Sequence, residues 1–304
     1  MSTSPQAPHP WSFWGRLLLV PLIWGMAFVW AKIGADGMEA AAAAFIRYFC
    51  ASLALLFACW RLEGRLPALP RRQWRGAVLL AVTGVSLYNM MIFGALQSLE
   101  ASRASLLIAL SPALIAFGST VFLREALGWR RFLGLFLALA GAWVVILRGD
   151  LMHPSLGFGK GEALMLAAVA CWVTYSLYSR RFQDRNQEMG MSLLAMTTWI
   201  SLIGTFMLLP LAIPSLMHLK PAASHPAPWA ALALMGLLGT AVAFIWYAEG
   251  IQKIGAARTA VFTNLVPVFA VTSSIMFLNE EMHWSLLAGG GMILGGVVLV
   301  QKKN

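Results

Sequence analysis

The sequence predicts an all-α integral membrane protein of ten transmembrane helices, built as two inverted five-helix repeats. Three observations lead to this prediction. The 304-residue chain is 60% apolar and only 11% charged, whereas a soluble domain is about 25% charged. Its apolar residues gather into ten long runs. Residues 97–145 also match residues 252–300 without a gap, which indicates an internal duplication.

Each of the ten runs holds the roughly 20 mostly apolar residues that a spanning helix needs. We expect them at residues 14–34, 40–60, 75–96, 101–123, 129–148, 160–180, 191–213, 229–250, 257–278 and 284–301. Residues 1–13 are predicted to form a cytoplasmic tail. The first run lacks a small-residue cleavage site, so we expect it to stay as the first helix.

The basic residues predict the orientation. With the N-terminus inside, sixteen Lys and Arg residues fall in inner segments and five in outer segments. Inner loops of membrane proteins are enriched in Lys and Arg, so both termini are predicted to be cytoplasmic. The basic residues lie between apolar runs and form no single stripe. The net charge of +10 is therefore attributed to topology and not to nucleic-acid binding.

The repeat predicts how the two halves are related. Identical residues in register, 155 positions apart, are Gln97 and Gln252, Arg103 and Arg258, Pro112 and Pro267, Glu125 and Glu280, Trp129 and Trp284, and Gly141 and Gly296. The second copy begins five helices after the first. Because five is odd, the copies lie upside down relative to each other, as in many secondary transporters. The halves are residues 14–148 and 160–301, connected by 149–159.

This organisation resembles the drug/metabolite transporter superfamily, specifically its EamA-type members. The resemblance covers nearly the whole chain, and it rests on Trp24-Gly25, on Ala101…Pro112…Leu123-x-Glu125, and on its echo Ala256…Pro267…Leu278-x-Glu280. It implies a bacterial inner-membrane exporter without a cofactor that works by alternating access. The first, third, fourth, sixth, eighth and ninth helices would line a central cavity. The aromatic content favours the YddG-like exporters of aromatic amino acids, and efflux of a drug or another metabolite is the alternative.

Two matched prolines suggest hinges beside the central site. Pro112 and Pro267 lie near the middle of the fourth and ninth helices. A proline removes one helical hydrogen bond, which here frees the carbonyls of Ile108 and Thr263. Thr263 and its neighbour Asn264 are candidates for polar contacts to a substrate. The competing interpretation is a static kink in a packed helix.

Aromatic residues at mid-helix positions suggest the substrate pocket. Trp24 and Trp172 align at an offset of 148, Tyr175 lies one turn after Trp172, and Tyr88-Asn89 is central in the third helix. Aromatic faces with a few hydrogen-bonding groups suit an amphipathic solute. Packing between helices or contact with membrane lipid is the alternative.

Arg47 is an ionisable residue inside a predicted span, which makes it a candidate functional charge, although it could snorkel towards the membrane surface. No Asp or Glu lies near the centre of a span. A proton-driven carrier usually needs such a carboxylate, so the sequence favours facilitated movement down the gradient of the solute.

The charges of the repeat suggest a gate. Arg103 and Arg258 begin their helices and Glu125 and Glu280 end theirs, against the preference of the helix dipole. Topology places Arg103 with Glu280 outside and Arg258 with Glu125 inside. We therefore expect crossed ion pairs between the halves, with interfacial snorkelling as the alternative.

The remaining features are expected to be structural. Gly134-x-x-x-Ala138 and Gly291-x-x-x-Gly295 permit close helix packing, so the fifth and tenth helices either join the halves or form a homodimer contact. A membrane-embedded enzyme is the rival class. The sequence has no HExxH motif or Ser/His/Asp set and no metal-ligand spacing among its three cysteines, and its histidines all lie in the tail or in turns: His9, His153, His218, His225 and His283.

Overall fold

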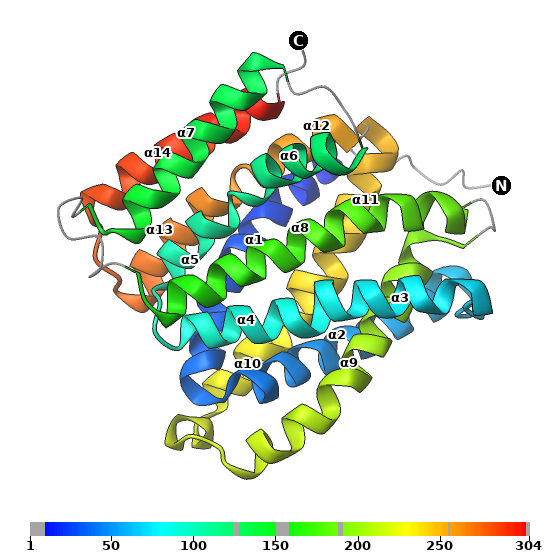
Figure 1. Ribbon diagram of the computed structural model, residues 1–304. Helices are drawn as coiled ribbons and strands as arrows, with labels where there is room; N and C mark the ends of the chain where they lie inside the picture. The colour runs from blue at the N-terminus through cyan, green and yellow to red at the C-terminus, as the bar shows by residue number, and fades with distance from the viewer. Residues whose placement is uncertain (1–9, 124–127, 150–157, 188–190, 255, 302–304) are drawn as a thin grey trace.

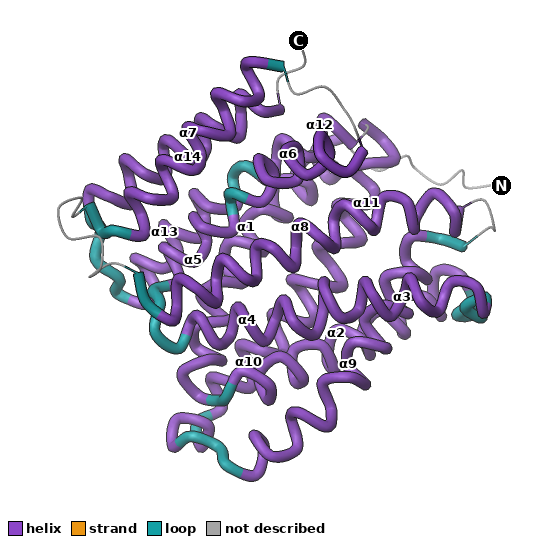
Figure 2. The backbone as a smooth tube through the Cα atoms, in the orientation of Figure 1, coloured by secondary structure: helices purple, strands orange, loops and turns teal. Residues whose placement is uncertain are grey.

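The computed structural model describes residues 10–123, 128–149, 158–187, 191–254 and 256–301. Within these residues every regular element is a helix (Figure 2), and ten helical stretches are long and apolar enough to cross a membrane. The predicted all-α architecture with ten spans is confirmed. Helices are expected here, because a helix satisfies its own backbone hydrogen bonds where lipid offers no partner.

The first five spans run from α1 to α7 (Figure 1). The elements are α1 (Pro10–Gly37), α2 (Ala40–Glu63), η1 (Arg71–Gln73), α3 (Trp74–Leu80), η2 (Ala81–Ser86), α4 (Leu87–Leu96), α5 (Ala101–Ile108), α6 (Ser111–Leu123) and α7 (Trp129–Ile146). The first helix begins inside the segment that was predicted to be a tail, and it continues past the predicted end at residue 34.

The last five spans run from α8 to α14. The elements are α8 (Lys160–Gln187), α9 (Leu193–Met217), η4 (Pro221–Ser224), α10 (Pro226–Leu234), η5 (Met235–Val242), α11 (Ala243–Ile254), α12 (Ala256–Thr263), α13 (Val266–Leu278) and α14 (Trp284–Gln301). Segments far apart in the sequence pack together, because α1 lies against α13, α2 against α9, and α4 against α8.

The third and eighth spans each contain a π-helical segment. These segments are η2 and η5, and each holds a central glycine, Gly84 or Gly239. The two glycines stand 155 residues apart, at the spacing of the repeat. A π segment changes the hydrogen-bond register within a helix and is often found at functional sites.

The fourth and ninth spans are broken, whereas the sequence predicted one helix with a kink. Ala109 and Leu110 separate α5 from α6, and Asn264 and Leu265 separate α12 from α13. The following proline takes the second position of the new helix, where it costs little because that N–H needs no helical partner. The carbonyl of Ile108 accepts a hydrogen bond from Ser111 Oγ at 2.7 Å.

The fifth and tenth spans pack against each other within one chain, as α7 and α14 (Figure 1). A Cβ added at Gly141 would lie 2.6 Å from the carbonyl oxygen of Gly289, and one at Gly289 would lie 2.6 Å from the carbonyl oxygen of Gly141. Gly134 and Gly296 meet in the same way. These glycines let the two backbones touch.

The sequence identified only part of this contact. Gly134 takes part as expected, and Ala138 lies against Gly296. Gly291, however, has no atom within 4 Å of an added Cβ, and at Gly295 the nearest atom is 3.8 Å away. The tenth helix therefore uses Gly289 and Gly296, seven residues apart, because that spacing keeps both on one face over two turns.

Candidate functional site

A small pocket lies between the third and sixth spans and is covered by the second, seventh and eighth. Its volume is about 30 Å³, room for one or two water molecules. The residues that line it are Tyr48, Gly84, Val85, Trp172, Tyr175, Thr197, Ile200, Ser201, Thr240 and Phe244. We call it the aromatic pocket.

Three predicted site residues form a row of rings beside this pocket. The ring centroid of Trp172 lies 5.0 Å from that of Tyr88 and 5.1 Å from that of Tyr175. Tyr175 also packs on Gly84 of η2, where an added Cβ would lie 2.3 Å from the ring. The glycine in the π segment therefore makes room for the aromatic row, and the structure brings Tyr88, Trp172 and Tyr175 together.

Trp24 has a related environment against the eighth span. Its Nε1 donates to the carbonyl of Gly239 in η5 at 2.9 Å. Its ring lies 5.7 Å from Phe244 and 5.3 Å from Tyr247, centroid to centroid. Phe244 lines the aromatic pocket, so Trp24 packs against a lining residue but does not itself line the pocket.

Arg47 points into the protein and does not snorkel. Its guanidinium donates to Oδ1 of Asn89 and lies 5.1 Å from the centroid of the Tyr48 ring. Asn89 is fully buried, and its Nδ2 donates to the carbonyl of Val85 at 2.7 Å. Arg47 Nε is buried and finds no hydrogen-bond acceptor in the part of the chain that the structure describes. Arg47 is therefore a cation with one unused hydrogen-bond donor, and it contacts the ring of Tyr48, which lines the aromatic pocket.

Thr263 and Asn264 are not brought to this pocket, contrary to the expectation from the sequence. Asn264 Nδ2 donates instead to Gln301 Oε1 at the end of α14, at 3.0 Å. The reason is the break in the ninth span. Asn264 lies in the turn between α12 and α13 and does not follow the helical face that an unbroken helix would give it.

The lining also differs from the six-helix cavity that the family resemblance implied. The first, fourth and ninth spans do not contribute to the aromatic pocket, whereas the second and seventh do, through residues such as Tyr48 and Ser201. The sequence offered one signal for the seventh span, since hydroxyl side chains at Thr197, Ser201 and Thr205 interrupt an apolar run. Thr205 meets Ser52 of α2 at 2.9 Å between hydroxyl oxygens.

The expected ion pair between Arg103 and Glu280 does not form, because each finds another partner. Arg103 is 2% exposed and pairs with Glu162 at 3.2 Å. It also donates to the carbonyls of Val145 and Ile146, at 2.9 and 2.7 Å. These carbonyls belong to the last turn of α7, where helical acceptors are left free and a cation is favoured.

Glu280 accepts hydrogen bonds from the backbone N–H groups of Ala101 and Ser102, at 2.7 and 3.0 Å. These groups lie at the N-terminus of α5, where a negative charge is favoured. Asn279, in the left-handed conformation with φ 53°, precedes Glu280 in the turn after α13. The predicted inner pair lies outside the described residues, because Glu125 and the side chain of Arg258 are not among them.

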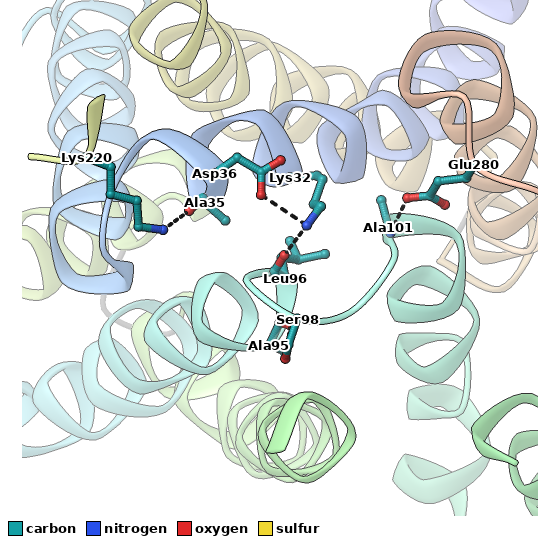
Figure 3. A network of polar contacts seen from close by, with 9 residues as sticks. All are labelled: Lys32, Ala35, Asp36, Ala95, Leu96, Ser98, Ala101, Lys220 and Glu280. Carbon is teal, nitrogen blue, oxygen red and sulfur yellow. Dashed lines mark hydrogen bonds and ion pairs between the residues drawn. The ribbon is translucent and has the colours of Figure 1, made fainter. Parts of the chain in front are cut away.

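Charged residues lie at both ends of the first span. At the end near Arg16, Nη1 of Arg16 lies 3.1 Å from Glu249 Oε2, and Lys253 Nζ lies 2.8 Å from Glu249 Oε1. At the opposite end, a cavity of about 260 Å³ lies beside Lys32. Figure 3 shows Lys32 and Asp36 together with Glu280, three of the charged residues that line it. Its lining residues are Lys32, Asp36, Gln97, Ser98, Leu99, Glu100, Leu278 and Glu280. We call this cavity the vestibule.

Comparison with known proteins gives a consistent family match. The description of the matching family model is EamA-like transporter family, and it matches twice, over residues 11–147 and 159–301. The uncharacterized transporter YyaM of Bacillus subtilis is 26% identical, over 95% of this chain and 95% of its own. A solved crystal structure superposes with a TM-score of 0.61 at 17% identity, over 95% of this chain and 97% of its own, which shows a shared fold.

Two other relatives have names that mention a substrate. The probable terminal-alkyne amino-acid exporter of Streptantibioticus cattleyicolor is 28% identical, over 95% of this chain and 93% of its own. The S-adenosylmethionine/S-adenosylhomocysteine transporter of Chlamydia trachomatis is 30% identical, over 90% of this chain and 86% of its own.

Proposed function

Because the chain belongs to the EamA-like transporter family, we propose that it is a secondary transporter that exports aromatic or other hydrophobic amino acids. Transport takes place by alternating access, with the aromatic pocket as the central substrate site. In a bacterium the protein lies in the inner membrane. The relative named as an amino-acid exporter supports this proposal.

The observation that carries the proposal is the position of Arg47 beside the aromatic row. A cation inside a membrane span is costly and often marks a substrate path. Arg47 keeps donor capacity for a carboxylate, which arginine binds in a planar, charge-assisted geometry. The rings of Trp172, Tyr175 and Tyr88 offer flat faces to an apolar or aromatic side chain. The two features together match an amino acid with a hydrophobic side chain.

At about 30 Å³ the aromatic pocket is too small for such a substrate, so it must widen during transport. The broken fourth and ninth spans allow that movement. Each consists of two short helices joined by a two-residue turn, and turns between helices absorb backbone rotation in hinge motions. Pro112 and Pro267 keep their role as hinge residues in this proposal.

The movement is proposed to be facilitated diffusion. Of the carboxylates within the described spans, Glu162 and Glu249 are each held in an ion pair, with Arg103 and Arg16 respectively. None of the residues that line the aromatic pocket is an Asp or Glu, so the described site offers no carboxylate as a proton carrier.

A second candidate substrate is S-adenosylmethionine, favoured by the relative of that name. Such a molecule carries a carboxylate for Arg47 and a flat base for the aromatic row. It differs from a hydrophobic amino acid in size and charge, so direct transport measurements separate the two candidates.

The test is uptake of labelled phenylalanine, leucine and S-adenosylmethionine into liposomes that contain the purified protein, with and without a pH gradient. We expect uptake of the two amino acids that changes little with the gradient. Uptake of S-adenosylmethionine alone would favour the second candidate. A strict need for the gradient would contradict facilitated diffusion, and no uptake of either amino acid would contradict the amino-acid proposal.

A matched pair of variants locates the site. Trp172→Ala is expected to lower phenylalanine uptake about tenfold, since about 1.4 kcal/mol of lost ring contact is a factor of ten. The control is Trp143→Ala on α7, where the tryptophan is 51% exposed on a membrane-facing helix. Equal losses in both variants would contradict a substrate role for the aromatic pocket.

A further inference from the structure

The vestibule is the larger of the two cavities described above. It lies where α1, α4, the turn before α5 and the end of α13 meet, and its volume is about 260 Å³. This is slightly below the range of about 300–1,000 Å³ that is typical for drug-sized ligands. The Lys and Arg distribution predicts that this face lies outside.

Carboxylates dominate the charge of the vestibule. Asp36, Glu100 and Glu280 line it, together with one cation, Lys32. Glu280 is fully engaged, because each of its oxygens accepts a backbone N–H of α5. The charge that remains for a ligand therefore lies on Asp36 and Glu100.

Glu100 is the least satisfied of these groups. Its Oε2 is buried and has no hydrogen-bond donor within the described ranges. Arg103 acts on Glu100 electrostatically, but its own ion pair and hydrogen bonds go to Glu162, Val145 and Ile146. A buried charged acceptor without a donor is costly, and a ligand that supplies N–H donors would remove that cost.

Lys32 shows that an ammonium group fits this environment. Its Nζ lies 3.1 Å from Asp36 Oδ1 and donates to the carbonyl of Leu96 at 2.7 Å (Figure 3). A carboxylate and a backbone carbonyl thus already hold one –NH₃⁺ at the edge of the cavity. Half of the Asp36 side chain remains exposed (53%), so it is open to a second cation.

We propose that the vestibule is a second binding site, which receives the primary ammonium group of the transported solute on the outer face. Glu100 is the main acceptor and Asp36 the second, while Leu99 and Leu278 contact the apolar part of the ligand. The inference rests on the proposed function for the identity of its ligand. It places the recognition of the ammonium group in the vestibule, apart from the recognition of the carboxylate at Arg47.

Two analogues of phenylalanine each carry only one of its two charged groups, so they test the two groups separately. Phenethylamine has the ammonium group without the carboxylate, and 3-phenylpropionate has the carboxylate without the ammonium group. Their binding to the purified full-length protein in detergent is measured by calorimetry, for the unchanged protein, for Glu100→Gln and for a control, Glu281→Gln. Glu281 lies next to Glu280, its side chain is 87% exposed, and it does not line the vestibule.

We expect Glu100→Gln to raise the Kd for phenethylamine about tenfold, because one charge-assisted hydrogen bond is lost. The Kd for 3-phenylpropionate should stay the same in Glu100→Gln, and both Kd values should stay the same in Glu281→Gln. An unchanged Kd for phenethylamine in Glu100→Gln overturns the proposal. An equal loss for both analogues also overturns it, because it indicates a general structural defect.

A second variant and a salt-displacement measurement complete the test. Asp36→Asn is expected to weaken phenethylamine binding in the same way, and it replaces Glu100→Gln if that variant does not fold. Displacement of phenethylamine by sodium chloride but not by choline chloride would assign the site to an inorganic cation and overturn the ammonium proposal. Because binding is measured without transport, a failure of amino-acid uptake in liposomes removes the proposed function and leaves this result unaffected.

Discussion

At the scale of single residues, Arg47 explains how a charge is kept inside a membrane span. It lies seven residues after the start of α2, about 10 Å along the helix axis. The guanidinium is held by Asn89 Oδ1 and the face of the Tyr48 ring. Keeping a charge inside a membrane span with only neutral partners costs free energy, and a substrate carboxylate would offset that cost only while it is bound.

We predict that Arg47→Lys lowers phenylalanine uptake about tenfold by raising KM, because lysine keeps the charge but loses the planar donor pair. The control is Arg61→Lys on the same helix, where the guanidinium lies 6.0 Å from the ring centroid of its neighbour Trp60 at the exposed end. Its uptake should stay within about twofold of the unchanged protein, as for surface substitutions away from special contacts. Equal binding of 3-phenylpropionate by the unchanged protein and Arg47→Lys would contradict a carboxylate role.

At the scale of elements, the structure repeats its irregularities as well as its helices. The π segments η2 and η5 occupy matching places in the third and eighth spans, and the breaks before Pro112 and Pro267 occupy matching places in the fourth and ninth. Irregular backbone at membrane depth is tolerated where protein or a cavity surrounds it. Trp24 supplies such protection for Gly239, and Ser111 does so for Ile108.

The pairing of α7 with α14 gives a stability test. We predict that Gly289→Ala destabilises the protein by about 1–3 kcal/mol, the usual cost of overpacking, since the new Cβ would lie 2.6 Å from the carbonyl oxygen of Gly141. The measurement is thermal or SDS unfolding of the purified protein. Gly291→Ala on the same helix is the control, because nothing lies within 4 Å of its added Cβ. A loss of stability at Gly291 as large as at Gly289 would argue against this contact.

At the scale of the whole molecule, the two faces of the described structure differ. At the end of the first span near Arg16, the ion pair of Arg16 with Glu249 joins α1 to α11, and Lys253 pairs with the same carboxylate. At the opposite end, near Lys32, the vestibule has a volume of about 260 Å³, while the aromatic pocket has only about 30 Å³. Under the proposed function and the predicted orientation, this combination fits a carrier whose substrate site is shut and whose outer approach is accessible, one of the states that alternating access requires.

The orientation in the membrane remains a prediction, and it is tested by reporter fusions. A green fluorescent protein fused after residue 304 should fluoresce, and alkaline phosphatase at the same place should be inactive, because the excess of Lys and Arg holds that end in the cytoplasm. A fusion within residues 149–159, in a predicted outer segment, should give the opposite pair of results. An active phosphatase at the C-terminus would reverse the assigned orientation.

The sequence by itself determined that the chain crosses the membrane ten times, because apolar runs of this length have no other stable environment. It also pointed to Tyr88, Trp172 and Tyr175, since aromatic residues near the middle of spans stand out against an aliphatic background. Only the tertiary structure decided which helices meet: that Arg103 pairs with Glu162, that Glu280 binds the start of α5, and that Asn264 faces α14. These contacts join residues far apart in the chain, and apolar helices in lipid carry no sequence pattern strong enough to fix how each is rotated towards its neighbours.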